Sequence, residues 1–317
     1  GVKVVLKPNG YQENTMQLWA RSAGGYSLVD DATYQRTYGM ISSIDSFGLG
    51  ELDIEQLNNF MQGKRFNVNT QINTYSEDIF GESDQDSIEE FFQILHLKFV
   101  GARKDQARFD WIKDLYLPQI EQRMNNPNYQ FSLAIQNAVN TGNPRQGEFD
   151  LDRLALQNLD DIYTLHTRSF SNAADFEFVI VGDMDLAKME DMLSTYVASL
   201  PASSARDLMV ALPEYQQDDW VEVDLAIGSE PKATVVINYT GDGTWSHKND
   251  LVFDALIASL DNRLRTRLRE ELAGVYSVAV NGSLRRWPHQ NYVVQVSFSC
   301  DPDRINELRT EVEKVFD

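Results

Sequence analysis

A stretch without sustained hydrophobic periodicity, residues 202–219, divides this sequence into two parts. It is rich in Ser, Pro, Gln and Asp, which is typical of a linker rather than of a helix or a strand. Strand-like and helix-like patterns precede it for about 200 residues, an ordinary length for a domain, and new patterns begin at Trp220. We therefore predict two domains, at residues 1–212 and 213–317.

In the first predicted domain, the hydrophobic spacing changes between the strand period of two and the helix period of 3.6. Residues 2–7 and 16–22 alternate, and the turn residues Pro8, Asn9 and Gly10 between them predict a β-hairpin. The remaining patterns predict helices over 31–45, 53–63, 87–99, 106–124, 129–139, 151–170 and 185–200, and strands over 66–80 and 176–182. Strands and helices in separate runs indicate an α+β domain.

The second predicted domain repeats this order on a shorter length of chain. Strands are expected over 221–227, 233–239, 275–281 and 292–300, with one long helix over 251–272. With under 100 residues from Trp220 onward, the second domain is expected to be truncated.

The charge balance excludes some classes of partner. The sequence has 28 Lys and Arg against 48 Asp and Glu, a net charge of -20, so attraction to a nucleic-acid backbone is disfavoured. The single cysteine, Cys300, rules out an intramolecular disulfide, and its alternating surroundings predict a core position. No apolar run approaches the roughly 18 residues that span a bilayer, so no membrane span is expected.

Local motifs for metal or nucleophilic chemistry are missing. The run Gly25-Tyr26-Ser27 lacks the closing glycine of a nucleophile elbow. The four histidines are far apart and form no H-E-x-x-H, H-x-x-E-H or Cys/His motif: His96, His166, His247 and His289. We therefore expect no metal ligands in this chain. An unrelated hydrolase built from dispersed His and Asp residues stays an open alternative.

One constellation combines charge with a sharp change of structure. The helix predicted over 251–272 ends at Gly274, and a strand containing Tyr276 follows at once. Its apolar stripe is predicted to comprise Val252, Leu256 or Ile257, Leu260, Leu264 and Leu268. Its last turns carry Arg263, Arg265, Arg267 and Arg269. Arginines in the last turns of a helix are favoured by the helix dipole, and a Tyr in a strand commonly serves packing. The four arginines and Tyr276 therefore have a purely structural explanation as well.

The same residues resemble a family. Asn262-Arg263-Leu264, followed by the run from Leu268-Arg269 through Gly274-Val275-Tyr276, is similar to the C-terminal-domain signature of the M16 zinc peptidases, also called pitrilysins or inverzincins. The resemblance extends along the chain, and long-chain bacterial members of the PqqL type are especially similar.

This resemblance implies two consecutive LuxS/MPP-like metallohydrolase-type domains, each with a mostly antiparallel sheet and helices packed on one face. Together the two domains would form one half of a two-part chamber. In the family, the N-terminal half binds Zn²⁺ through H-x-x-E-H, whose Glu activates water. The corresponding segment here, residues 31–45, contains neither His nor Glu. The implied partners are the N-terminal catalytic half of the same protein and a peptide or unfolded-protein substrate, in a periplasmic location.

The family's conserved Arg and Tyr correspond to Arg269 and Tyr276. The resemblance implies that Tyr276 is catalytic, donating a hydrogen bond to the oxyanion, and that both residues bind substrate. The chain would then be the non-catalytic, substrate-binding C-terminal half of a zinc endopeptidase. The alternative is an inactive scaffold or partner subunit, which needs neither residue.

Expressed alone, this chain is expected to have no peptidase activity, because the zinc and its water belong to the other half. Metal analysis by mass spectrometry and a chelator-sensitive peptide hydrolysis assay check this expectation. One bound equivalent of zinc together with chelator-sensitive hydrolysis would refute it.

Overall fold

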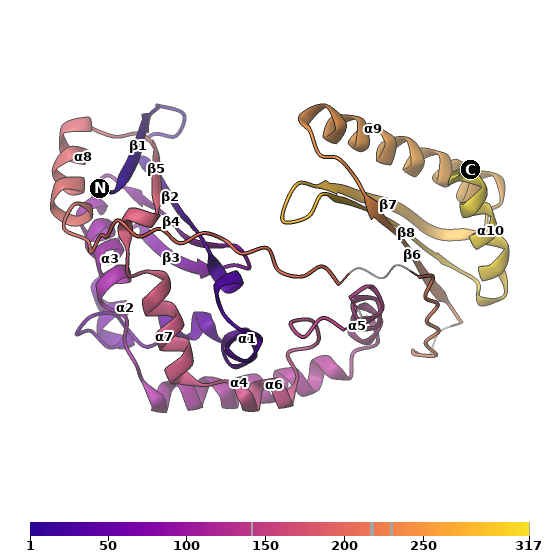
Figure 1. The fold of residues 1–317 in the computed structure, drawn as a ribbon, viewed down its shortest axis with the longest axis horizontal. Coiled ribbons are helices and arrows are strands. Elements are labelled where there is room, and N and C mark those ends of the chain that lie inside the picture. The colour runs from indigo at the N-terminus through magenta and orange to yellow at the C-terminus, as the bar shows by residue number, and fades with distance from the viewer. Residues whose placement is uncertain (141, 216–218, 229–230, 317) are drawn as a thin grey trace. The chain divides into compact units, whose positions relative to one another are not determined.

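The computed structural model of the chain describes residues 1–140, 142–215, 219–228 and 231–316 (Figure 1). The chain forms two compact units. The first comprises Gly1–Asn126 and Gly147–Val210, and the second comprises Pro127–Gln146 and Ala211–Asp317. The predicted linker residues 216–218 lie outside the described residues, and the predicted domain boundary at 212/213 stays a prediction.

The first unit contains one sheet, seven α-helices and four short helical turns in its described residues. Its strands are β1 (Lys3–Pro8), β2 (Thr15–Ala23), β3 (Phe66–Ile72), β4 (Ser76–Asp84) and β5 (Glu177–Gly182). Its α-helices are α1 (Asp31–Thr37), α2 (Ile54–Met61), α3 (Ile88–Val100), α4 (Gln106–Met124), α6 (Leu151–Leu156), α7 (Leu159–Ser169) and α8 (Leu186–Met192). The short turns are η1 (Gly25–Leu28), η2 (Ile41–Ser46), η3 (Ala173–Asp175) and the π-helical η4 (Leu193–Val197).

The strand order of this sheet is β1-β5-β2-β4-β3, and the predicted hairpin between the first two strands is wrong. Strand β5 lies between them, parallel to β1 and antiparallel to β2. The turn residues after β1 serve this long-range pairing, since the Asn9 N–H donates to the Gly182 carbonyl over 2.9 Å. Phe178 and Ile180 of β5 are completely buried, so burial of a central strand outweighs the local hairpin signal.

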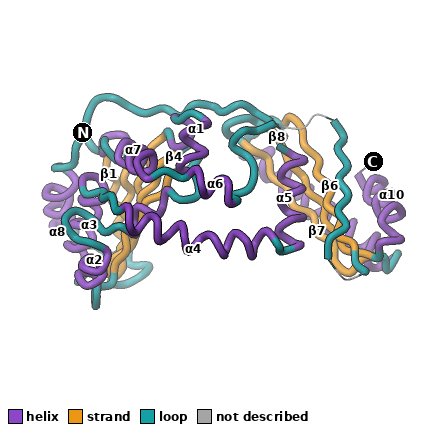
Figure 2. Tube along the Cα trace, turned by 90° about the horizontal axis from the view of Figure 1, so that it is seen from below, coloured by secondary structure: helices purple, strands orange, loops and turns teal. Residues whose placement is uncertain are grey.

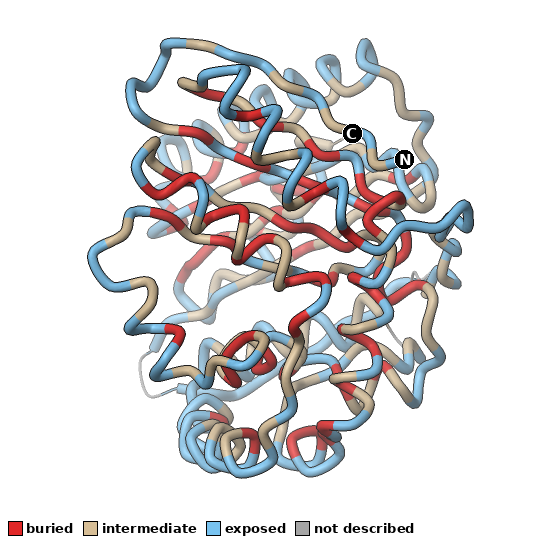
Figure 3. Tube along the Cα trace, turned by 90° about the vertical axis from the view of Figure 1, so that its left-hand side faces the viewer, coloured by how far each residue is buried: buried red, intermediate tan, exposed pale blue. Residues whose placement is uncertain are grey.

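Alternation along each strand places one face of the sheet against helices. In β2, Met16, Leu18 and Ala20 are at most 2% exposed, while the residues between them face the other way. Figure 2 shows α2, α3 and α8 on one side of this sheet. Figure 3 shows buried residues gathered along the strands and the helices packed on them.

Two predicted helices are interrupted. The helix predicted over 31–45 ends at Thr37, because Tyr38 is extended and Gly39 has φ of 100°. Gly39 also has no room for a side chain, since a Cβ there would lie 2.4 Å from the Phe149 ring. The η2 turn then follows. The helix predicted over 151–170 is divided into α6 and α7, and the Asn158 side chain caps α7 by accepting from the Asp161 N–H over 3.0 Å.

The predicted caps at two aspartates are confirmed. Asp53 forms a reciprocal capping box with Gln56 at the start of α2. Asp185 accepts hydrogen bonds from the Ala187 and Lys188 N–H groups at the start of α8. The Asp185 side chain is thereby committed to the helix rather than to a cation.

The second unit contains a three-stranded antiparallel sheet of order β6-β8-β7. Its elements are α5 (Pro127–Val139), β6 (Ala233–Asp242), α9 (His247–Leu264), the π-helical η5 (Arg265–Glu271), β7 (Val275–Arg285), β8 (Asn291–Cys300), η6 (Pro302–Arg304) and α10 (Ile305–Phe316). Figure 1 shows α9 and α10 on one side of this sheet. The buried side chains of α10, Leu308 and Val312, and Cys300 of β8 belong to one core, so the predicted core position of Cys300 is confirmed.

The strand predicted over 221–227 is wrong. Its residues form no strand, and the alternating side chains of Val221, Val223, Leu225 and Ile227 are 37–51% exposed. Alternation alone does not make a strand, because its backbone also needs a partner. The wider fold prediction is confirmed: this is an α+β chain with mostly antiparallel sheets and helices on one face of each.

One carboxyl group is buried in the first unit at the Gly24–Gly25 turn. Glu77 is 2% exposed, and its Oε1 accepts a hydrogen bond from the Gly25 N–H over 2.8 Å. Its Oε2 has no hydrogen-bond partner among the described residues. The pKa of the Glu77 carboxyl is raised to about 7. Burial is the main cause and Asp207 adds to the rise, while the hydrogen bond from Gly25 and the charge of Arg168 oppose it.

Because the folded pKa of Glu77 exceeds the ordinary value of 4.5, the folded state binds this proton more tightly than the unfolded state. The contribution of Glu77 to the free energy of unfolding therefore falls as pH rises from about 4.5 to about 7.

Glu77→Gln should remove this fall, because the amide does not titrate. The free energy of unfolding of the variant minus that of wild type should increase by on the order of 3 kcal/mol between pH 4.5 and pH 8. Urea unfolding at several pH values measures it. Glu82→Gln, at an exposed carboxyl of the same strand, is the control, and parallel pH profiles for Glu77→Gln and wild type would contradict the expectation.

Candidate functional site

Helix α9 positions the predicted Arg and Tyr site by packing on the second unit's sheet. Leu264 and Leu268 are completely buried and Leu260 is 6% exposed, as the predicted stripe requires. Of the two predicted alternatives at the next position, Ile257 packs against the core and Leu256 is 49% exposed. The prediction for Val252 is wrong, because it is 60% exposed and Phe253 packs against the core instead.

The last turns of this helix, Arg265–Glu271, are π-helical. A π-helical turn adds a residue to the helical repeat, is less favourable than α-helix, and occurs frequently at functional sites. The insertion shifts the phase of the side chains that follow it while Leu264 and Leu268 keep their buried positions. The orientation of residues 269–272 is therefore set by this turn rather than by an ideal α-helix.

The four arginines of this region divide into two pairs. Arg265 contacts Asp261 over 2.9 Å, and Arg267 contacts Glu271 and Glu311 over 2.6 and 2.7 Å. These two side chains have structural partners. Arg263 and Arg269 are exposed, and neither side chain makes a hydrogen bond or ion pair with any residue that the structure describes.

The turn after the π-helix is tight. Ala273 has φ of 44°, and the Gly274 N–H donates to the Leu268 carbonyl over 2.9 Å. The sequence assigned the helix end to Gly274, but the left-handed residue is Ala273. Gly274 is required by packing, since a Cβ there would lie 2.5 Å from Leu308 Cδ2 and 3.3 Å from the Arg304 guanidinium.

Tyr276 occupies a β-bulge. Val275 pairs with Cys300 and Ser277 pairs with Ser299, so Tyr276 has no opposite residue in the register. A bulge re-aims side chains and is common beside active sites. Here it places both Tyr276 and Ser277 on the exposed side, with Tyr276 66% exposed, and returns Val278 to the core.

The face of this sheet away from α9 and α10 is polar but mostly uncharged. The Ser277 and Ser299 hydroxyls lie 3.1 Å apart, and Gln295 donates to Asn238 over 3.0 Å. Along the three strands, this face carries Ser277, Ala279, Asn281, Ser283, Ser299, Ser297, Gln295, Val293, Thr234, Val236, Asn238 and Thr240. Such a face can offer hydrogen bonds to a peptide without a strong charge preference, and Tyr276 lies at its end.

The bulge was missed by the sequence analysis, although a signal exists. In Val275-Tyr276-Ser277-Val278, two polar residues separate two valines, and this spacing breaks the strand period of two. An extra residue in the strand restores both valines to the core. The pairing of Arg267 with Glu311 had no such signal, because the two residues are far apart in the chain.

Three of the four histidines are buried or contact a backbone carbonyl. Within the described ranges, no group of three or more His, Cys, Asp or Glu side chains could hold a metal ion. His96 Nδ1 contacts the Tyr196 carbonyl over 2.8 Å, and His289 Nε2 contacts the Leu212 carbonyl over 3.0 Å. Burial lowers the pKa of His166 to about 4, which keeps it neutral.

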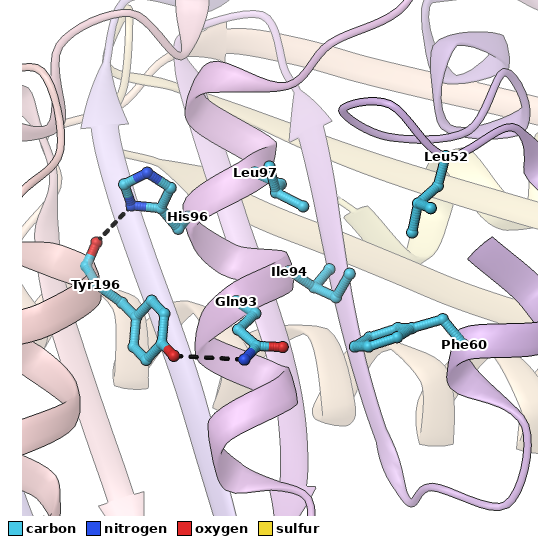
Figure 4. A pocket seen from close by; sticks show the side chains of 7 residues that line it. All are labelled: Leu52, Phe60, Gln93, Ile94, His96, Leu97 and Tyr196. Atoms are coloured by element: carbon cyan, nitrogen blue, oxygen red, sulfur yellow. Dashed lines mark hydrogen bonds between the residues drawn. The ribbon is translucent and has the colours of Figure 1, made fainter. Parts of the chain in front are cut away.

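The first unit has an apolar surface pocket of about 310 Å3 between α2, α3 and η4 (Figure 4). It is lined by Leu52, Phe60, Gln93, Ile94, His96, Leu97 and Tyr196. Its polar side chains bond to one another, with Gln93 donating to the Tyr196 hydroxyl over 3.4 Å. The pocket offers apolar contact but no reactive group.

In the described part of the chain, no helix is both long and apolar enough for a transmembrane span.

The fold and site define a class: an α+β domain with mostly antiparallel sheets, an exposed Arg and Tyr, and no metal-binding cluster among its described residues. The family described as peptidase M16 inactive domain matches residues 158–317. The chain therefore belongs to this family.

Two curated relatives are similar over nearly the whole chain. Both are named probable zinc protease PqqL: the protein of Haemophilus influenzae is 24% identical over 327 residues, covering 100% of this chain, and that of Escherichia coli is 21% identical, covering 99%. The chain spans 34% of the length of each. The crystal structure of the periplasmic protease PqqL from Escherichia coli shows the same fold, with a TM-score of 0.83, 20% identity, and coverage of 99% of this chain and 34% of that one.

Gly274→Ala is expected to lower the free energy of unfolding by about 1–3 kcal/mol, because the added methyl overpacks against Leu308 and Arg304. Urea denaturation of the chain measures the loss. Gly10→Ala is the matched control, since a Cβ there meets nothing within 4 Å. Equal stability of the two variants would show that the turn can relax around the methyl group.

Proposed function

We propose that this chain is the non-catalytic, substrate-binding C-terminal half of a periplasmic zinc endopeptidase. The Zn²⁺ and its water would be held by the N-terminal half of the same protein, and this half would contribute Arg269 and Tyr276 to the cleavage chamber. The observation that carries the proposal is the bulge at Tyr276, which presents a largely exposed phenol with no partner among the described residues.

The local backbone supports a functional reason for this arrangement. A π-helical turn, a left-handed Ala273 and a bulge follow one another within residues 265–276, and each is less favourable than regular structure. Together they surround Arg269 and Tyr276. Side chains that served only to pack would be buried or paired, as Leu268 and Arg267 are.

The two side chains fit complementary tasks. A phenol O–H can donate to the oxyanion that develops when water attacks a peptide carbonyl. A guanidinium can donate two parallel hydrogen bonds to a substrate carbonyl or carboxylate. The membership in the M16 inactive-domain family and the names of the PqqL relatives support a zinc peptidase as the parent protein.

The test is co-expression with the N-terminal half and measurement of peptide turnover. Tyr276→Phe removes only the hydroxyl and should lower kcat by about 100-fold, the cost of one oxyanion donor. Arg269→Ala should mainly raise KM. Arg265→Ala is the matched control, because Arg265 is also exposed but paired with Asp261.

Zinc content, measured on the same preparations, should stay unchanged in all three variants. If Tyr276→Phe and Arg269→Ala both leave kcat and KM at the wild-type values, the chain is a scaffold or partner subunit and the proposed role is wrong.

A further inference from the structure

The face of the first unit's sheet away from its helices carries an apolar row that crosses four strands. By register, Val5 pairs with Val179, Val179 with Trp19, and Trp19 with Phe80. The next position across the sheet is Asn69. Neighbouring strands lie about 4.8 Å apart, so the four side chains form a row about 14 Å long.

This row is outside the core of the unit. Trp19 is 52% exposed and Val5 is 40% exposed, whereas the residues beside Trp19 in sequence, Leu18 and Ala20, are buried under the helices. The Trp19 and Phe80 rings lie 5.8 Å apart and form the aromatic half of the row. Exposed large side chains in a continuous row indicate a binding surface more than isolated ones do.

The Trp19 ring is held by a buried carboxylate. Its Nε1–H donates to Asp78 Oδ1 over 3.4 Å, and the Arg21 guanidinium lies 5.6 Å from the ring centroid. Arg21 contacts the two Asp78 oxygens over 2.6 and 3.2 Å. Asp78 is 2% exposed and also accepts from Asn73 over 2.6 Å and Ser76 over 3.2 Å. The platform is therefore ordered before any ligand arrives, which reduces the entropy lost on binding.

The positive and negative groups beside the row are equal in number. In the adjacent row, Lys3 contacts Glu177 over 2.8 Å and Arg21 contacts Asp78. The row on the other side contains Lys7, Val181, Gln17, Glu82 and Asn67. In a chain of net charge -20, this locally balanced surface favours neither an acidic nor a basic ligand. Its complement is an uncharged apolar or aromatic side chain.

The width of the row selects the shape of the ligand. Rows on one face of a sheet are separated by two residues along each strand, or about 7 Å, so the apolar surface is one row wide. A helix, about 10–12 Å across, would cover the ionic row as well. An extended chain fits, and its residues i, i+2 and i+4 span about 13 Å, close to the length of the row.

We infer that Val5, Val179, Trp19 and Phe80 form a subsite for an extended polypeptide segment with apolar side chains at every second position. The inference rests on the proposed function in taking an unfolded polypeptide as the ligand. It adds a subsite in the first unit, built from residues separate from Arg269 and Tyr276.

The test uses the whole chain and a labelled, uncharged nine-residue peptide in which Ser alternates with Phe or Val, with binding followed by fluorescence anisotropy. Trp19→Ser should raise the Kd at least about fivefold, as loss of a central aromatic contact does. Asn69→Leu extends the apolar row by one strand and should lower the Kd at least about twofold. This gain of affinity keeps the test decisive even if Trp19→Ser fails to fold.

Trp287→Ser is the matched control, because Trp287 is 61% exposed but belongs to the second unit, and it should leave the Kd unchanged. An all-Ser peptide should not bind. The inference is overturned if Trp19→Ser and Asn69→Leu both keep the wild-type Kd. A second outcome also overturns it: the peptide does not bind, and sedimentation shows a dimer of wild type that Trp19→Ser dissociates. The row would then bind a second copy of the chain.

The two proposals fail separately. Turnover that is unaffected by Tyr276→Phe and Arg269→Ala refutes the catalytic-chamber role, whereas a Kd that is unaffected by both row variants refutes the subsite.

Discussion

Burial of one sheet face beneath helices is the constraint on which both units depend. Side chains alternate across a strand, so once Leu18 and Ala20 of β2 or Val278 and Val280 of β7 enter a core, their neighbours must point away from it. Those neighbours include Trp19 in the first unit and Ala279 in the second. Each core thereby determines which side chains are available for binding on the opposite face.

The bulge at Tyr276 shows what happens when this alternation must be changed. Val275 and Val278 both enter the core, although they are three positions apart, and the strand accommodates this with one unpaired residue. The preceding π-helical turn likewise leaves Leu264 and Leu268 buried while altering the phase of the residues after it. The π-helical turn and the bulge thus occur where a regular helix or strand would not keep these apolar side chains in the core.

Ion pairs distinguish the arginines that stabilise the fold from those whose guanidinium groups are free to bind a ligand. Arg267 joins the helix end to α10 through Glu311, and Arg21 is held by the buried Asp78, so both guanidinium groups are committed to the fold. Arg269 lies two positions from Arg267 in sequence but is exposed and unpaired within the described residues. The proposal for Arg269 depends on this contrast, since the helix dipole would favour both residues equally.

The sequence by itself determined the α+β class, most helices, the caps at Asp53 and Asp185, and the buried Cys300, because these follow from local periodicity and composition. The motif around Gly274 also indicated which family to expect. Only the tertiary structure decided that β5 separates β1 from β2, that residues 221–227 form no strand, and which arginines are paired. Each of these depends on residues distant in sequence: a strand needs a backbone partner and an arginine needs a carboxylate, and neither partner is specified by local pattern.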